Sequence, residues 1–243
     1  MRLTVVLSII FLLLSGSIYA ADPVKDSRNI DEFHQPGENS PLVPSEYVWF
    51  FGYIPTDGWV AHSFSLTNNH EDTVTILKFI PGCDCTHVPR TPITFAPGET
   101  KLVKIDFDTK TYSGETNRDV HVMTDYKVNP NLDLYFASVI GMRPRTVKIS
   151  PASTVFIAGK EKQTISVINL IDEDVDVKII IDMDSSLSVS KASFELEGEE
   201  TVEFDIIPNW DKVGFGPQHY SVTVEFERED AFRISIPVKT NKF

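Results

Sequence analysis

One series of short sequence motifs occurs twice, in the same order, in this chain of 243 residues. The first copy, Ser63–Asp125, contains SFSLTN, PGCDCT, PITFAPGET and NRDVHVMTD in that order. The second copy, Thr164–Glu227, contains TISVIN, IDMDSS, ASFELEGEE and HYSVTVEFE at matching positions. Because each copy approaches the size of a small domain, the repeat predicts two related domains. Both cysteines of the chain, Cys83 and Cys85, fall in the first copy only, so the shared fold does not need them.

Both copies consist of short segments with alternating side chains, separated by turn residues. In the first copy, every second residue of one segment falls on the same face of an extended strand: Val60, His62, Phe64 and Leu66. The tripeptide PGE of the first copy and EGE of the second are typical of tight turns, because glycine admits a positive φ. About seven short strands per copy, spaced about 8–12 residues apart, are typical of a sandwich. The sequence therefore predicts an all-β chain with two tandem immunoglobulin-like β-sandwich domains.

The individual strands follow from the same pattern. No segment keeps a helical period over a dozen or more residues, so helix content should be low. The strands expected in the first domain are Tyr47–Ile54, Trp59–Thr67, Val74–Ile80, Thr100–Phe107, Asp119–Thr124 and Leu132–Ile140. Those expected in the second are Thr164–Asn169, Val175–Ile181, Phe194–Leu196, Val202–Ile206, Tyr220–Phe226 and Phe232–Val238.

The chain begins with the pattern of a cleaved export signal. Arg2 precedes the apolar run Val5–Leu14, and small residues lead to a plausible cleavage point after Ala20. The apolar run is too short to span a bilayer, and no other segment is long enough to do so. The mature chain is therefore expected to be exported, periplasmic or secreted, without a transmembrane segment.

The remaining boundaries follow from composition. We expect a signal peptide at 1–20, and a flexible leader at 21–46, where the chain is polar and rich in turn formers. The first domain is expected at 47–141, a short linker at 142–146, and the second domain at 147–243.

The first domain resembles a known family in a series of short motifs. These are Phe51-Gly52, Phe64, Asn68, Gly82-Cys83-Asp84-Cys85-Thr86, Pro97-Gly98-Glu99, Gly114 and Gly141. Together they resemble the bacterial DUF1573 family, whose immunoglobulin-like domains are related to the ASPM/SPD-2/Hydin type. The family usually has Cys-Gly-Cys-Thr where this chain has Asp84 between its cysteines. The resemblance covers roughly Phe51–Gly141, and it implies a fold and an exported or envelope setting but no reaction.

Three residues near the end of an expected strand could hold a metal ion. Cys83, Cys85 and His87 are spaced i, i+2 and i+4, so on an extended strand their side chains point to one face. Two thiolates and an imidazole suit copper(I) or zinc(II), although a fourth ligand would have to come from elsewhere in the chain. No cofactor is expected apart from this candidate copper or zinc ion.

Two other states of the cysteines stay open. An exported protein meets an oxidising compartment, which favours a disulfide between Cys83 and Cys85. On an extended strand their Cα atoms would lie about 6.5–7 Å apart, at the limit of about 6.8 Å for a disulfide, so the bond would be strained and easily reduced. The third alternative is a pair of free thiols that pack as small apolar side chains.

No catalytic residues are expected. The sequence contains no Gly-x-Ser-x-Gly elbow, no His-Glu-x-x-His pair and no glycine-rich phosphate loop. The formal net charge of −13 argues against nucleic acid as a partner, because nucleic-acid binding needs basic patches. The chain is therefore not expected to be an enzyme.

The expected function is binding or structural support. We expect an exported, non-catalytic module of the cell envelope that acts through β-sandwich edges and loops, since exposed strands bind extended peptides. Its partner would be another envelope or extracellular protein. The alternative is a thiol-redox or copper/zinc-binding envelope protein that uses Cys83, Cys85 and His87.

Overall fold

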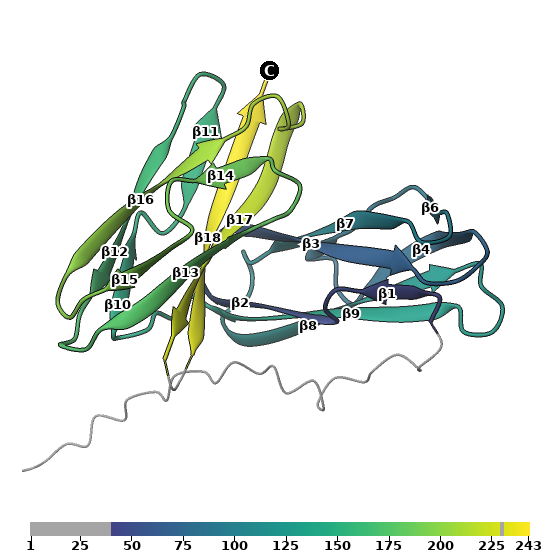
Figure 1. Cartoon of the computed structure of the whole chain (residues 1–243), viewed down its shortest axis with the longest axis horizontal. Coiled ribbons are helices and arrows are strands. Elements are labelled where there is room, and N and C mark those ends of the chain that lie inside the picture. The colour runs from purple at the N-terminus through teal and green to yellow at the C-terminus, as the bar shows by residue number, and fades with distance from the viewer. Residues whose placement is uncertain (1–39, 229–230) are drawn as a thin grey trace, which may run out of the picture.

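Strands whose side chains alternate between two faces pair into two β-sandwiches, one after the other along the chain (Figure 1). The computed structural model describes residues 40–228 and 231–243, and these residues contain strands, turns and loops but no helix. The prediction of an all-β chain with two tandem immunoglobulin-like β-sandwiches is confirmed.

The first sandwich contains the strands β1 Leu42–Pro44, β2 Val48–Ile54, β3 Trp59–Asn68, β4 Val74–Pro81, β5 Thr86–His87, β6 Ile93–Phe95, β7 Thr100–Asp108, β8 Gly114–Thr124 and β9 Asn131–Ile140. One of its sheets has the order β1-β3-β7-β5, and the other has the order β2-β9-β8-β4-β6. The side chains between the sheets are apolar and fully buried, among them Phe51, Phe64, Phe95 and Phe107.

The second sandwich contains β10 Val147–Ser150, β11 Thr154–Ile157, β12 Gln163–Asn169, β13 Val175–Ile181, β14 Leu187–Val189, β15 Ser193–Leu196, β16 Thr201–Pro208, β17 Gly216–Glu227 and β18 Phe232–Lys242. Its sheets have the orders β10-β12-β16-β14 and β15-β13-β17-β18, and β11 pairs in parallel with β18. A second apolar core fills the space between them, with Phe156, Phe204 and Phe226 at most 1% exposed.

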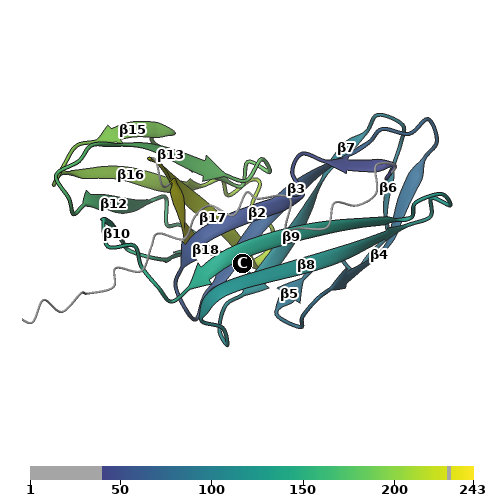
Figure 2. The same cartoon turned by 90° about the horizontal axis from the view of Figure 1, so that it is seen from below.

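The two sandwiches share a sheet. Strand β18 pairs in parallel with β2 of the first sandwich, where Ile234 lies opposite Tyr53, so one ten-stranded sheet runs through both lobes. Figure 2 shows β18, β2 and β9 in succession from below. Gly52 permits the close approach, because it has a φ of 70° at a bulge in β2 and a Cβ atom there would collide with the Arg233 carbonyl.

Some boundaries differ from the prediction. The leader was expected to be flexible through residue 46, but β1 lies within it and pairs with Leu66–Asn68 of β3. Leu42 is fully buried, which explains why so short a strand forms in a polar segment. Strand β8 starts at Gly114 rather than Asp119, because it pairs with β9 from its first residue. The expected signal peptide and residues 21–39 lie outside the described residues.

Candidate functional site

The two cysteines lie in a turn that follows β4. Pairing of β4 with β8 ends at Pro81, which frees the chain to turn. The Thr86 N–H then donates a hydrogen bond of 3.2 Å to the Cys83 carbonyl, and β5 begins at Thr86. The expectation of an extended strand over Cys83–His87, with three side chains on one face, is therefore wrong.

The turn brings the two cysteines together. Their Cα atoms are 5.2 Å apart, within the range of about 4.4–6.8 Å that disulfides take. Cys85 is 9% exposed and belongs to the core of the first sandwich, whereas Cys83 is half-buried and packs against that core. The Thr86 hydroxyl lies 3.3 Å from the sulfur of Cys83 and 3.9 Å from that of Cys85. A reactant from solvent would therefore reach Cys83 first.

His87 takes part in a cluster of rings between the sandwiches. Its ring meets the edge of the Trp59 indole, with 4.7 Å between centroids. The same indole stacks on His219 of the second sandwich at 4.6 Å, and His219 Nδ1 lies 3.9 Å from a carboxylate oxygen of Asp106. A cavity of about 450 Å³ lies beside Trp59 and His219.

A metal site on the cysteines has no support in this geometry. Across residues 40–228 and 231–243, no group of three or more His, Cys, Asp or Glu side chains is placed to hold a metal ion. The turn brings the two cysteines together, whereas His87 packs against Trp59. The copper or zinc site on Cys83, Cys85 and His87 stays a prediction.

Side chains of the second sandwich close the outer edge of β3. Strand β1 covers this edge only as far as Pro44, and Ser45 N–H then donates to the Ser65 carbonyl at 2.8 Å. Beyond that point the Ser63 N–H donates to a carboxylate oxygen of Asp182 at 3.3 Å, and the Ala61 N–H donates to the Ser221 hydroxyl at 2.9 Å. The sandwiches are thus joined by hydrogen bonds to an edge that would otherwise be open.

A buried imidazole lies between two carboxylates at this junction. His62 Nε2 is 2.8 Å from a Glu46 oxygen, and His62 Nδ1 is 3.3 Å from an Asp182 oxygen. Burial lowers the pKa of His62, but the hydrogen bonds to Asp182 and Glu46 and their negative charges outweigh burial and raise the pKa above its usual value. The imidazolium form therefore stabilises the junction.

A stack of three side chains extends this junction to β18. The Trp49 indole lies parallel to the His62 ring with 3.9 Å between centroids. On the Trp49 ring lies the Arg233 guanidinium, 4.7 Å from the ring centroid. Arg233 also pairs with Glu225 at 2.6 Å and donates to the Phe50 carbonyl at 3.2 Å. Sequence reasoning missed this cluster, because its members come from both sandwiches and no local pattern connects them.

Strand β7 leaves part of one edge open. On one side β7 pairs with β3 along its whole length. On the other side β5 pairs only with Asp106 and Phe107. Pro89, two residues after the end of β5, has no N–H with which to continue the ladder. The edge from Thr100 to Ile105 therefore has no strand partner among the described residues.

The direction of the main-chain groups at this edge follows from β3. Ser63 and Ser65 bond away from β7, to Asp182 and to Ser45 respectively. Their opposite residues in the ladder are Lys104 and Leu102. Because directly opposite residues of an antiparallel pair share the same hydrogen-bonding phase, Lys104 and Leu102 direct their N–H and C=O groups away from β3. Leu102 is 38% exposed, so this edge is accessible.

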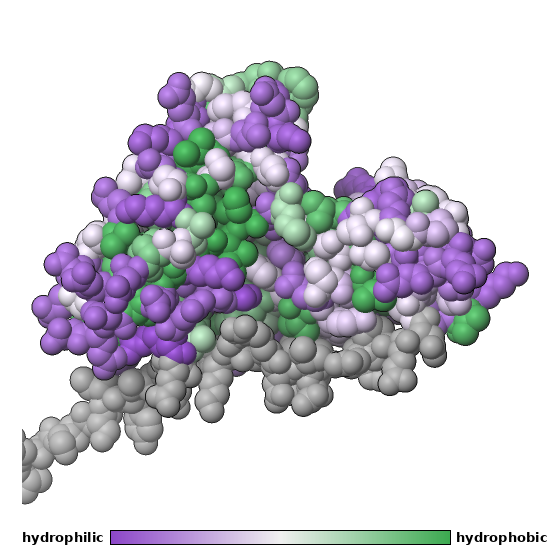
Figure 3. Space-filling view, in the orientation of Figure 1, coloured by the Kyte–Doolittle hydropathy of each residue, from purple (hydrophilic) through white to green (hydrophobic). Residues whose placement is uncertain are grey.

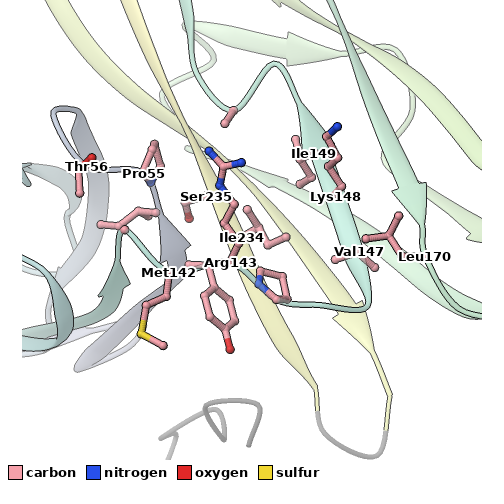
Figure 4. Close-up of a pocket in the computed structure, with 15 residues that line it drawn as sticks. Pro55, Thr56, Met142, Arg143, Val147, Lys148, Ile149, Leu170, Ile234 and Ser235 are labelled. Atoms are coloured by element: carbon pink, nitrogen blue, oxygen red, sulfur yellow. The ribbon is translucent and has the colours of Figure 1, made fainter. Parts of the chain in front are cut away.

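A pocket lies between the sandwiches, next to the contact of β2 with β18 (Figure 4). Its walls come from the end of β2, from the segment that links the sandwiches, from β10 and from β18. The pocket has a volume of about 270 Å³.

The fold defines the class of this protein as a tandem β-sandwich protein of the immunoglobulin-like type. Residues 44–140 match the family described as "Protein of unknown function (DUF1573)", so the resemblance of the first domain to that family is confirmed. No curated protein matches the chain. The match and the fold support a β-sandwich binding or structural module.

Several solved structures are similar to this chain. One is a protein of unknown function from Porphyromonas gingivalis W83, with 9% identity, 82% of this chain and 100% of that chain covered, and a TM-score of 0.35. Another is the CupB2 chaperone of Pseudomonas aeruginosa, with 13% identity, 80% of this chain and 98% of that chain covered, and a TM-score of 0.32. A third is an ASH/PapD-like domain of human CEP192, with 11% identity, 44% of this chain and 91% of that chain covered, and a TM-score of 0.35. These likenesses concern the fold alone.

The part of the chain that the structure describes holds no helix with the length and apolar character needed to cross a membrane.

Proposed function

We propose that this protein is an exported, non-catalytic binding module of the cell envelope, which binds an extended segment of another envelope or extracellular protein at the edge of β7. The open edge between Thr100 and Ile105 carries the proposal. An added strand would pair with the outward N–H and C=O groups of Leu102 and Lys104, which supply main-chain hydrogen bonds to any extended peptide.

The open edge of β7 keeps the main-chain groups that strand addition needs. Natural proteins protect open edges with charges, proline or bulges. Strand β7 contains no proline, so each main-chain N–H of its open part can donate, although Lys101 and Lys104 place two charges on the strand. Leu102 offers an exposed apolar side chain on one face, while Val103 and Ile105 anchor the strand in the core. An added strand would thus extend a sheet that is already rigidly held.

The non-catalytic part of the proposal rests on the sequence. The short motifs that are typical of serine hydrolases, zinc metalloproteases and phosphate-binding loops do not occur in the chain. Export rests on the N-terminal pattern of Arg2, the apolar run Val5–Leu14 and the small residues before Ala20.

The test uses peptides selected from a random display library against residues 21–243. Strand addition predicts slower amide hydrogen exchange at Leu102 and Lys104 when peptide is bound. Replacing Leu102 by Pro removes an outward N–H, and it should lower peptide affinity at least tenfold. The matched control is Glu203→Pro, because Glu203 of β16 occupies the place of Leu102 in the second sandwich. Equal affinity of Leu102→Pro and wild-type protein would reject the proposed edge.

A second candidate function is thiol–disulfide exchange. It is favoured by the meeting of Cys83 and Cys85 in a turn, with the outer cysteine half-buried and the inner one in the core. Intact mass of the mature protein, with and without alkylation, tests it. A mass lower by two hydrogens and no alkylation would indicate a disulfide, whose reduction potential would then be measured. Two alkylated thiols in protein isolated under oxidising conditions would reject this candidate.

A further inference from the structure

We propose that the pocket between the sandwiches binds a small amphiphilic carboxylate, that is, an apolar chain or ring that ends in a carboxylate group. This inference is independent of the open edge of β7, which belongs to the first sandwich alone. It depends on the shape of the pocket, its charge and the rigidity of its walls.

The pocket has an apolar interior. Ile54, Val147 and Ile234 lie among its walls, and the first two are almost completely buried. Leu170 and Met142 complete the walls and are 50% and 45% exposed, so apolar surface continues to the mouth of the pocket. Figure 4 labels four of these side chains, Met142, Val147, Leu170 and Ile234, along the pocket. An occupant would remove this surface from water, which is favourable for an apolar group.

The charge around the pocket is positive. The 15 lining residues include Arg143 and Lys148 but no Asp or Glu. Both cations are exposed, and neither forms an ion pair with a described residue. Arg145 lies between them in the sequence, so the segment Met142–Lys148 has three cations and no acid. In a chain with a formal net charge of −13, this local excess of positive charge is complementary to an anion.

The cations select the charged group of the ligand. An arginine guanidinium can bind both oxygens of a carboxylate at once, and a lysine adds a point charge. An amine would be repelled, and a neutral apolar molecule would gain nothing from the two cations, which would stay hydrated. An anion with an apolar body therefore fits both parts of the site.

The walls of the pocket are fixed before a ligand binds. The Gly141 N–H donates to the Ile54 carbonyl at 2.9 Å, and the Leu170 N–H donates to the Thr146 carbonyl at 2.8 Å. The Ser235 hydroxyl donates to the Phe51 carbonyl at 2.7 Å and ties β18 to β2. A pocket that is already formed does not lose affinity through ordering.

The volume limits the size of the ligand. Pockets for small ligands usually have about 300–1,000 Å³, and this pocket has about 270 Å³. It therefore suits a molecule of the size of octanoate and not a long acyl chain.

The first experiment titrates residues 21–243 with octanoate and follows backbone amide signals by NMR. We expect saturable shifts at Val147, Leu170 and Ile234. Acetate has the charge without the apolar chain, and 1-octanol has the chain without the charge, so each should bind at least tenfold more weakly. Absence of saturable shifts with octanoate, shifts spread far beyond the residues that line the pocket, or equal binding of 1-octanol would overturn the proposal.

The second experiment separates the two parts of the site. The double variant Arg143→Gln/Lys148→Gln should lower octanoate affinity at least tenfold and leave the weak binding of 1-octanol unchanged. The variant Ala152→Phe should fill the pocket and abolish binding of both probes. The matched control is Lys78→Gln/Arg90→Gln, which removes two exposed cations of the first sandwich. Full affinity in the Arg143/Lys148 variant would contradict the proposal even if Ala152→Phe failed to fold.

Discussion

Asn68 and Asn169 make the same set of hydrogen bonds in the two sandwiches. Each is the last residue of a central strand, and each is at most 2% exposed. The side-chain amide of each donates to three main-chain carbonyls, and its oxygen accepts one main-chain N–H. The partners of Asn68 are Asp72, Phe95, Ala96 and His70, and those of Asn169 are Glu173, Leu196, Glu197 and Ile171. Both asparagines thereby fasten one sheet to the turns of the other.

Replacing either asparagine by alanine should destabilise its own sandwich. Each replacement leaves carbonyl groups in a buried corner without their partner, and an unsatisfied buried group costs about 1–3 kcal/mol. We expect Asn68→Ala and Asn169→Ala each to lower the free energy of unfolding by about 2–3 kcal/mol in urea titrations. Asn117→Ala, at an exposed position of β8, is the control and should change it by less than about 0.5 kcal/mol. Equal effects of Asn68→Ala and Asn117→Ala would contradict this role.

The repeated asparagines explain why so much of the fold could be predicted from the sequence. Each asparagine ends a strand in which every second side chain points into the core. In β3, Val60, Phe64 and Leu66 are such side chains, and all three are fully buried. Alternation of this kind is a local property, so it can be seen in the sequence alone.

The junction between the sandwiches could not be predicted in this way. Ala61 and Ser63 lie on the face of β3 opposite Val60, Phe64 and Leu66, yet both are buried because the second sandwich covers them. Ser63 and its partner Asp182 are 119 residues apart, and no local pattern signals such a pair. Strand β1 escaped prediction for another reason, since three residues are too few to show alternation.

The junction should weaken as pH rises. The folded-state pKa of His62 is raised above its ordinary value of about 6.5, which applies to the unfolded chain. The stabilisation by the imidazolium is therefore complete below about pH 6.5, and it is lost as pH rises through the folded-state pKa. We expect the free energy of unfolding, measured in urea, to fall as pH rises from about 6.5 through the folded-state pKa of His62. The variant His62→Gln should lose most of this pH dependence.

The control for this pH dependence is His121→Gln. His121 pairs with Asp133 inside the first sandwich, away from Asp182 and Glu46. The fall in stability with pH should persist in this variant. A fall of the same size in His62→Gln would show that another group is responsible.

Gly52 should tolerate no side chain. Its φ of 70° is strained for any other residue, and a Cβ atom would also collide with the main chain of Arg233. Gly52→Ala should lower the free energy of unfolding by about 3 kcal/mol or more, since strain and overpacking each cost about 1–3 kcal/mol. Gly98→Ala separates the two causes, because Gly98 has a φ of 73° but open space around its Cα. Its expected loss in urea titrations is about 1 kcal/mol. Equal losses in the two variants would show that the contact with Arg233 is unimportant.

Removing both cysteines should leave the fold in place. A disulfide between Cys83 and Cys85 closes a very small ring, and the stabilisation of the folded state by a disulfide grows with the length of the loop. The second sandwich has the same corner asparagine and turn without any cysteine, which shows that this fold forms without them. We expect Cys83→Ser/Cys85→Ser to lower the free energy of unfolding by about 1–2 kcal/mol, and the amide spectrum beyond the turn to stay unchanged. A loss well above this, or loss of the dispersed spectrum of the first sandwich, would show that the cysteines hold the fold together.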